Sequence, residues 1–553
     1  SHGIIYQKDA ANLDIDEYSG HTTVVYAHDA ATPNTMKGGD IIVNKAVGTE
    51  NVMTLFTDTN GVTMGNQDAV LNALAEKLTY KSYADNKLTG KLSINEGLTA
   101  SSAHKNITFK TSGKGSYATS GADTHKPITA ADATAGTYTL TADERRELTP
   151  ANLSAGFGSP RKNSALANYD GDAVGNATTG LTVDLKGHNL TLGVSAPASD
   201  NTYIATIYAG RETAATPAKT LTIKNSEGNG KITLSAKHDK TSRTVEGLHA
   251  DKYSIVNIEA PLEIQSVEAA GTNAHGIYVN EGANVSLKNL TIQHVQGGGS
   301  PLQVYGIGAS KSATVNAEEV NISGVKGLAL YSLSAGNDQT KISVGGGTIT
   351  AESDTSNTKD YWAAYAPIGT IALNEGKDKK LTVVGNMQAG DNTHKGKIDA
   401  SFTTSDSSWT GAINRVGSGS IANITLSNGA TWTHEVQSGI LAGDASFTTS
   451  HLTKLTGGDS LTHAGVVKQG EKNILIDSYS GDTRFVFEHD AADPKQINGG
   501  NVTITSAAAG SHVTFSTNPD ANITDGNIKD VLNGLANKLF YTKYKNGETN
   551  LSG

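Results

Sequence analysis

Two serine-containing strings are the residues of this chain best suited to nucleophilic chemistry. Gly458-Asp459-Ser460-Leu461 sets a serine beside a carboxylate, and a looser glycine/serine string covers Gly417-Ser418-Gly419-Ser420. A serine becomes a nucleophile only where a base, most often a histidine, takes its proton. The first string follows Leu455-Thr456-Gly457, which has the composition of a turn. Glycine- and serine-rich turns produce the second string freely.

The Gly-Asp-Ser-Leu string resembles the signature of the GDSL esterases. That family also carries an Asp-x-x-His nearer its C-terminus, which supplies the base. The match in this chain, Asp391-Asn392-Thr393-His394, lies upstream of Ser460. Because the order is reversed, we interpret Ser460 as part of a structural turn.

The remaining polar motifs are weak. The 16 histidines include no His-Glu-x-x-His pair and show no metal-ligand spacing. His28 and His489 each precede an aspartate, and we interpret both as hydrogen-bonded turn residues. Asn168-Tyr169-Asp170-Gly171-Asp172 offers oxygen atoms to a calcium ion, but a plain turn is the better interpretation. The sequence therefore predicts no catalytic, cofactor-binding or metal-binding residue and identifies no ligand-binding residue.

Charge and composition narrow the class of protein. The 553 residues include 61 Gly, 11 Pro and no Cys, with 37% hydrophobic and 18% charged residues. This balance suits many short strands joined by polar turns. A formal net charge of −10 argues against nucleic acid as a partner. No apolar run reaches membrane-spanning length. The basic pairs Arg145-Arg146 and Arg161-Lys162 are interpreted as solvated turns, without the dense charge cluster that a polysaccharide lyase needs.

The elements between residues 180 and 350 are predicted to be short strands. Apolar and polar residues alternate in segments such as Leu221-Thr222-Ile223 and Ile255-Val256-Asn257-Ile258. A sandwich would need longer strands and two-residue hairpin loops. A coil of parallel strands fits better, with 285–287, 290–292 and 302–304 as successive faces of one turn. Inward positions would then stack Ile on Ile and Val on Val. The prediction is an all-β parallel β-helix with three short strands per turn.

Two further patterns accompany the strands. Ala400-Ser401-Phe402-Thr403-Thr404-Ser405 recurs at 445–450, a spacing that suggests two turns of the coil. One short flanking α-helix is predicted near 66–80 and another near 527–541. Each carries an apolar stripe, and Asn66 is the predicted N-cap of the first.

The chain nearly repeats itself after 461 residues. Tyr18-Ser19-Gly20 returns as Tyr479-Ser480-Gly481, and His28-Asp29-Ala30-Ala31 returns as His489-Asp490-Ala491-Ala492. Long repeats in series are typical of extended structural or adhesive proteins. We therefore expect one long unit plus the opening of the next, cut from a larger array. The predicted divisions are a repeat-opening motif (1–100), a β-helix body with loop excursions (101–464), and the start of a second copy (465–553).

Several strings resemble passenger regions of large type V autotransporter adhesins of Gram-negative-type bacteria. They are the repeated Tyr-Ser-Gly…His-Asp-Ala unit, His451-Leu452-Thr453-Lys454-Leu455-Thr456-Gly457-Gly458, and Ser427-Asn428-Gly429-Ala430-Thr431-Trp432-Thr433. The resemblance covers the two ends of the chain best. It implies that the predicted β-helix is right-handed. It also implies a secreted, cell-surface virulence protein, anchored in the outer membrane by a C-terminal barrel that this sequence does not contain. It supplies no catalytic or ligand residue.

Three functions follow as hypotheses. The first is a non-enzymatic surface adhesin that contacts host cells, glycans, matrix proteins or other bacteria. The second is a β-helical carbohydrate-active enzyme, either a polysaccharide lyase or an esterase. The third is a passive stalk or spacer. Unpaired strand edges could also pair with one another, which adds self-association to the expected partners. No cofactor is expected.

Overall fold

Two compact units make up the chain in the computed structural model. It describes residues 3–48, 51–63, 66–81, 88–94, 104–109, 115–116, 127–129, 132–148, 164–170, 180–211, 220–271, 273–333, 339–353, 355–376, 378–518, 522–543 and 551–552. The first unit comprises residues 1–124 and 142–147, and the second comprises 125–141 and 148–553. The predicted second copy (465–553) thus shares a compact unit with most of the predicted body.

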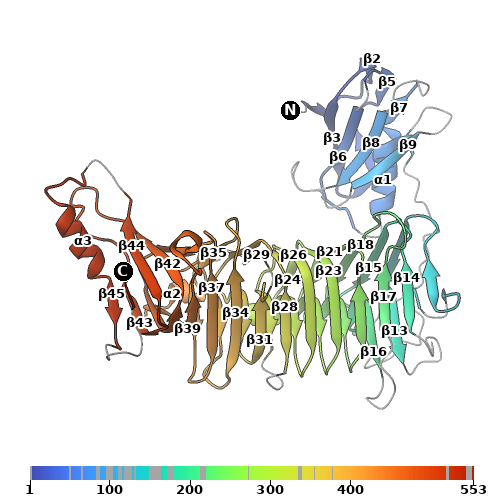
Figure 1. Ribbon diagram of the computed structural model, residues 1–553. Helices are drawn as coiled ribbons and strands as arrows, with labels where there is room; N and C mark the ends of the chain where they lie inside the picture. Colours follow the sequence, from blue (N-terminus) through green and yellow to red (C-terminus); the bar gives the residue numbers. More distant parts are fainter. Residues whose placement is uncertain are drawn as a thin grey trace. The chain divides into compact units, whose positions relative to one another are not determined.

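The second unit is built from parallel strands stacked in chain order (Figure 1). From β13 onward every described strand pair is parallel, and the antiparallel contacts there are isolated bridges. A sandwich of antiparallel hairpins is therefore excluded for this part of the chain. The all-β class and the predicted parallel pairing are confirmed.

The strands of the second unit follow three ladders. The first contains β14 (Leu181–Asp184), β17 (Thr220–Lys224), β20 (Ile255–Ile258), β23 (Asn284–Ile292), β26 (Thr314–Ile322), β28 (Lys341–Val344), β31 (Gly369–Leu373), β34 (Gly396–Phe402), β37 (Ile421–Leu426), β39 (Thr449–Thr456), β41 (Asn473–Ser480), β43 (Val502–Ala507) and β45 (Leu539–Tyr541). The second contains β15 (Leu190–Ala196), β18 (Ile232–His238), β21 (Leu262–Ala269), β24 (Val295–Gly297), β29 (Gly347–Thr350), β32 (Leu381–Val384), β35 (Ser408–Gly411), β38 (Thr431–His434), β40 (Gly465–Gln469), β42 (Asp482–Phe487), β44 (Ser511–Thr517) and β46 (Leu551–Ser552), together with the second halves of β23 and β26. The third is a nine-stranded sheet of β13 (Leu166–Asp170), β16 (Ile204–Arg211), β19 (Val245–Ala250), β22 (Ala274–Val279), β25 (Val304–Ala309), β27 (Leu328–Ser332), β30 (Trp362–Ala366), β33 (Met387–Ala389) and β36 (Ile413–Arg415). β11 (Thr137–Thr139) and β12 (Glu144–Leu148) precede these strands in the chain.

Columns of identical apolar residues fill the interior, as the sequence predicts. Val256, Val285 and Val315 occupy one register position on successive strands, and all three are fully buried. The same column continues through Ile342, Ile371 and Ile398. Burial of each such side chain is worth about 1.5–3 kcal/mol, so every added turn stabilises its neighbours.

Two local predictions need correction. Residues 285–287 and 290–292 lie on two different ladders, as predicted, because they pair with β20 and β21, but they belong to one continuous strand, β23. The next face begins at Val304 rather than Leu302. The two Ala-Ser-Phe-Thr-Thr-Ser strings are not equivalent turns of the coil. Phe402 lies inside β34 in the interior core, whereas Phe447 lies before β39 in a separate outer cluster. The surrounding turn, not the hexapeptide, decides the conformation.

The first unit contains a helix and two sheets, of which the larger mixes parallel and antiparallel strand pairs. Its strands are β1 (Gly3–Gln7), β2 (Leu13–Tyr18), β3 (His21–Asp29), β4 (Thr32–Lys37), β5 (Ile41–Ala46), β6 (Asn51–Thr57), β7 (Leu78–Tyr80), β8 (Leu88–Ile94), β9 (His104–Phe109) and β10 (Gly115–Ser116). One sheet runs β1-β3-β6-β8-β9-β10 with β4 beside β3, and the other runs β2-β5-β7. The pairings β1–β3, β2–β5 and β5–β7 reappear in the second copy as β40–β42, β41–β43 and β43–β45.

The predicted helices are present but shorter than expected. They are α1 (Gln67–Glu76) and α3 (Ile528–Ala536), and a third short helix, α2 (Ile440–Gly443), lies in the body. Leu78 and Leu539 begin strands, because they pair with Ile41 and Val502 of the neighbouring strands. Asn66 occupies the N-cap position without capping the helix.

Candidate functional site

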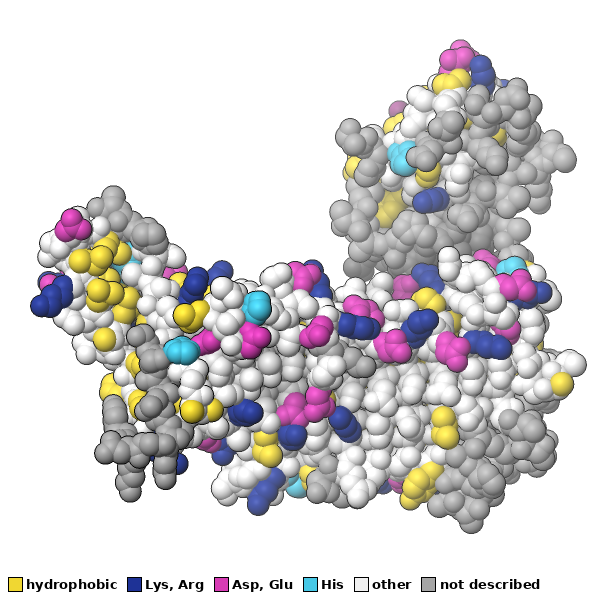
Figure 2. Space-filling view, viewed as in Figure 1, with side chains coloured by type: hydrophobic (Ala, Val, Ile, Leu, Met, Phe, Trp, Pro, Cys, Tyr) yellow, Lys and Arg dark blue, Asp and Glu magenta, His cyan; other side chains and the backbone are white. Residues whose placement is uncertain are grey.

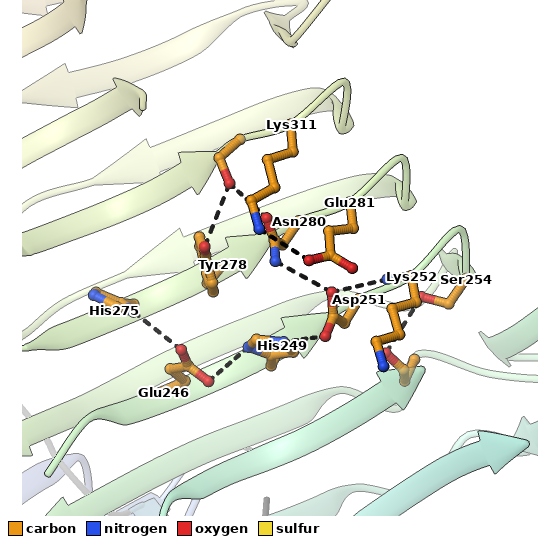
Figure 3. Close-up of polar contacts among 12 residues, drawn as sticks. Glu246, His249, Asp251, Lys252, Ser254, His275, Tyr278, Asn280, Glu281 and Lys311 are labelled. Atoms are coloured by element: carbon orange, nitrogen blue, oxygen red, sulfur yellow. Dashed lines mark hydrogen bonds and ion pairs between the residues drawn. The ribbon is translucent and has the colours of Figure 1, made fainter. Parts of the chain in front are cut away.

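A recurring glycine motif shapes the third sheet and gives it an unusual outer face. Gly247, Gly276 and Gly306 lie one above the other in β19, β22 and β25. A Cβ atom on any of them would come within 2.5, 2.6 or 2.7 Å of the carbonyl oxygen of the next strand. These close approaches require glycine. In β19 the side chains of Val245 and Leu248 belong to the interior core. The side chains of Glu246 and His249 lie next to each other on the outer face of the same strand (Figure 3).

A buried carboxylate lies at the centre of this outer face (Figure 3). The Glu246 side chain accepts hydrogen bonds from His249 Nδ1 at 2.8 Å and from His275 Nδ1 at 3.1 Å. Glu246 is 1% exposed, and the two histidines are 4% and 5% exposed. Two donors satisfy a carboxylate that burial would otherwise make costly. This buried group links two neighbouring strands, β19 and β22, through the His275–Glu246 hydrogen bond.

A second chain of polar contacts continues from the network toward the strand ends. His249 Nε2 lies 3.8 Å from Asp251, whose carboxylate also accepts hydrogen bonds from the Lys252 N–H and the Asn280 amide. Burial opposes ionisation of Asp251, but the hydrogen bond and charge of His249, with help from Lys252, outweigh it and lower the pKa. The Ser310 hydroxyl donates to the Asn280 side-chain oxygen at 2.7 Å, which extends the network to the residue that follows β25.

Aromatic rings form a column along the same face. One register position carries a ring on all but one of six successive strands. The series is Tyr208, His249, Tyr278, Gly308, Tyr331 and Tyr365. The ring of Tyr305 fills the space left by Gly308, where a Cβ atom would lie 2.3 Å from it. Centroids of neighbouring rings are 5.1–6.1 Å apart, the range of favourable aromatic pairs.

Three tyrosines of the column, Tyr278, Tyr331 and Tyr365, are half-buried and pack against an outer hydrophobic cluster. Burial raises the pKa of Tyr278 and of Tyr365 to about 12. Both phenols therefore stay protonated near neutral pH and can donate hydrogen bonds.

One end of the aromatic column is covered by a strap, which we define as residues 435–448. Leu441 and Phe447 of the strap are nearly fully buried in an outer cluster with Trp362. The Asn386 side chain fixes the strap through two bonds to the Gln437 backbone, at 2.9 Å each. Tyr278, Tyr331 and Tyr365 pack against this same cluster and stay partly exposed.

The serine motifs lie in turns. The Ser460 hydroxyl donates to the adjacent Asp459 carboxylate at 3.1 Å, and His463 Nδ1 contacts the same carboxylate at 2.7 Å. Ser460 immediately precedes a short 3-10 helix, Leu461–His463. His394 Nδ1 bonds Asp391 at 3.0 Å in a different turn. The Ser420 hydroxyl donates to the Val416 carbonyl at 2.6 Å, so the second serine string also closes a turn.

His28 is hydrogen-bonded as predicted, but it lies in strand β3 and not in a turn. This 7% exposed ring contacts Thr57 Oγ1 at 2.7 Å and the Asn60 carbonyl at 2.6 Å. His489 makes the matching contact with Thr517 Oγ1 at 2.7 Å.

Two other motifs differ from expectation. Asn168–Asp170 belong to strand β13 and not to a turn, and Gly171 and Asp172 lie outside the described residues. Arg145 and Arg146 are not solvated turn residues, because both are buried in β12 and paired with Glu147 and Glu144. Arg161 and Lys162 lie outside the described residues.

Sequence reasoning missed the outer face of the third sheet. Its signal was the motif Gly247-Leu248-His249-Ala250, which returns as Gly276-Ile277-Tyr278-Val279 and Gly306-Ile307-Gly308-Ala309. A glycine at a spacing close to one turn marks where successive backbones approach each other.

Comparison with protein-family models, curated proteins and solved structures finds no match to this chain. In the described residues, no group of three or more His, Cys, Asp or Glu side chains could hold a metal ion. No helix in that part of the chain is long and apolar enough to cross a membrane.

Proposed function

We propose that this chain is a non-enzymatic attachment rod of the autotransporter-passenger type, displayed on a bacterial cell surface. The observation that carries the proposal is the unbroken parallel ladder that runs through the body and into the second copy of the repeat motif. Such a stack grows by addition of turns and repeats, which suits a protein that must present a surface away from a cell.

The proposal includes the finer form of the fold, a right-handed coil with three strands per turn through the body. Support comes from the pairing pattern, in which most body strands pair with the strand three positions later in the chain. Parallel strands joined by crossover connections are right-handed in about 98% of cases, which favours that hand here.

The proposed contact surface for a receptor, glycan or matrix protein is the partly exposed stretch of the aromatic column, Tyr278, Tyr331 and Tyr365. Tyrosine is enriched at binding hot spots because it buries a large rigid ring and keeps a hydroxyl for hydrogen bonding. The proposal requires neither a cofactor nor a nucleic acid.

Pairing of surface charges favours attachment over polysaccharide cleavage. Basic and acidic side chains of the second unit lie next to one another in Figure 2 rather than in separate clusters. Lys231–Glu263, Lys311–Glu281 and Lys341–Glu375 are ion pairs with N–O distances of 2.5, 2.9 and 3.2 Å. Charges neutralised in this way leave little positive field to bind an anionic polymer.

The test is binding of the immobilised 553-residue chain to a glycan array, matrix proteins and cultured cells. Tyr331→Ala combined with Tyr365→Ala should weaken attachment at least about 30-fold, because truncation of even one hot-spot residue costs about 2 kcal/mol or more. Tyr203→Ala is the matched control, because Tyr203 is 40% exposed and lies outside the aromatic column.

Two outcomes would contradict the attachment proposal. Turnover of a polysaccharide or ester substrate, abolished by one Asp or Ser substitution, would show an enzyme. Consistent absence of binding to cells, glycans and matrix proteins would favour a passive spacer.

A further inference from the structure

The first two strands of the first unit present an open, partly apolar edge. Among the described residues, β1 pairs only with β3 and β2 only with β5. The inward-facing side chains Ile5, Leu13 and Ile15 are only partly buried. Ile4 and Tyr6, both on β1, are 45% and 59% exposed. An edge of this kind is a template for another strand.

The second copy shows what covers the equivalent edge. There β40 pairs with β38 of the body, with Val467 beside Trp432, and β41 pairs with β39, with Ile476 beside Leu452. The residues that correspond to Ile5, Leu13 and Ile15 are all fully buried. They are Val467, Ile474 and Ile476.

We propose that the β1–β2 edge is a docking surface for the last turn of a preceding copy of the body, carried in the same chain. The docking strands would have the sequence of Thr431–His434 and Thr449–Thr456. The register of the second copy carries over directly, so the counterpart of Trp432 would lie beside Ile5 and that of Leu452 beside Ile15.

Conserved backbone contacts argue that the two edges have the same shape. Asn12 Oδ1 accepts from the Asp40 N–H at 2.8 Å, and Asn473 Oδ1 accepts from the Asn501 N–H at 2.8 Å. The Gly39 N–H donates to the backbone carbonyl of Asp9 at 2.7 Å, and the Gly500 N–H donates to the backbone carbonyl of Gly470 at 2.8 Å. A surface that keeps its local contacts also keeps the strand spacing that its partner must match.

Strand direction selects among the candidate occupants. The covered edge in the second copy is parallel to its partner strands. Two copies of the β1–β2 edge related by a two-fold axis would pair antiparallel and would set like residues against each other. Only a different surface, such as the end of the body, reproduces the parallel arrangement.

Engineered disulfides test the proposed register, since the chain contains no native cysteine. In a chain where residues 3–94 replace 465–553, Leu452→Cys and Ile15→Cys of the transplanted copy should form a disulfide. Paired parallel strands lie about 4.8 Å apart, within the reach of such a bond.

Leu452→Cys with Ile476→Cys in the original chain is the positive control. Leu452→Cys with Asp14→Cys of the transplanted copy is the negative control, because Asp14 points to the opposite side of β2. A positive control that closes while the Leu452–Ile15 pair stays open would overturn the proposal.

A second measurement uses the 553-residue chain itself and does not depend on the transplant folding. Ile15→Cys should react with a thiol reagent about 100-fold faster than Ile476→Cys, because only the latter is covered. Equal rates would show that the first edge needs no partner. Protection of the Ile15→Cys thiol that rises with protein concentration would identify a second copy of the chain as the occupant and would also overturn the proposal.

Discussion

The two copies of the repeat motif share their local contacts but differ in burial. The Tyr18 hydroxyl donates to the Val52 carbonyl at 2.8 Å, as Tyr479 does to His512 at 2.6 Å. Lys77 Nζ donates to Gly38 at 2.7 Å, and Lys538 Nζ donates to Gly499 at 2.6 Å. About 90 residues of sequence therefore specify the same turns and hydrogen bonds in two different surroundings.

Burial depends instead on what lies on either side of each copy. Leu71 of α1 is fully buried, whereas its counterpart Leu532 of α3 is 58% exposed, and hydrophobic side chains gather over α3 in Figure 2. α1 packs against β4, β8 and β10, but α3 packs mainly against β44. At the opposite edge the order is reversed, since Ile476 is buried and Ile15 is not. The repeat motif itself determines the turns and hydrogen bonds of each copy, whereas the strands packed on either side of it determine how much of its apolar surface is buried.

The largest expected difference is between the matched core truncations Ile476→Ala and Ile15→Ala. Ile476→Ala empties a fully buried site and should cost about 2–5 kcal/mol of local unfolding free energy. Ile15→Ala should cost about 1 kcal/mol, because the side chain is already partly in water. Hydrogen exchange of β41 and β2 amides measures both, and equal costs would contradict the assignment of the covered edge.

Acid should loosen the junction of the second copy but not the free edge. Burial lowers the pKa of His434, in β38 directly beside β40, to about 4. The unfolded chain binds this proton near pH 6.5, so stability is full above that pH and falls as the pH drops toward 4. The loss should approach about 3 kcal/mol.

His434→Gln is the matched variant for the acid experiment, because it keeps a polar side chain that does not titrate. Thermal unfolding or β40 exchange at pH 7 and pH 4.5 should show a smaller pH dependence in the variant than in the original chain. An identical pH dependence would assign the acid effect to other groups.

A moderate effect is expected from the shared histidine contact. Thr57→Val leaves the buried His28 without one partner and should cost about 1–3 kcal/mol. Thr517→Val should cost less, because His489 and Thr517 are both half-exposed and water can replace the hydroxyl. Exchange rates of β6 and β44 amides report the two costs, and a larger loss at Thr517 would break the comparison.

The smallest difference is expected at the asparagines before the helices. Asn66 accepts from the Thr63 N–H and donates to the Gly61 carbonyl, and Asn527 makes the matching pair of contacts with Thr524 and Asn522. Both side chains are near solvent, so alanine should cost about 1 kcal/mol in either copy. Helix amide exchange that differs strongly between Asn66→Ala and Asn527→Ala would show that this contact also depends on neighbours.

Sequence periodicity was sufficient for the strands but not for their ends. Alternation of apolar residues predicted the parallel columns such as Val256, Val285 and Val315. It could not show that 285–287 and 290–292 form one strand, since a bend between two faces leaves no break in the pattern. The leucine at position 78 fitted a helical stripe, and its pairing with Ile41 in a strand is a tertiary effect that no local pattern contains.

The candidate site was largely beyond sequence reasoning. His249 lies three residues from Glu246 on β19, but His275 and Tyr305 come from the next two strands, and only the stacking of turns brings these two to the site. Isolated histidines and tyrosines carry no spacing signal. The serine motifs, by contrast, were correctly interpreted as turns, because their glycine-rich context already argued against a strained nucleophile.

Hydrogen exchange across the 553-residue chain at neutral pH tests the central claim most directly, that strand stacking on the preceding turn stabilises each copy of the repeat motif. The account predicts that amides of β40 and β41 exchange far more slowly than those of β1 and β2, despite their matching sequences. Equal protection of the two pairs of strands would contradict it.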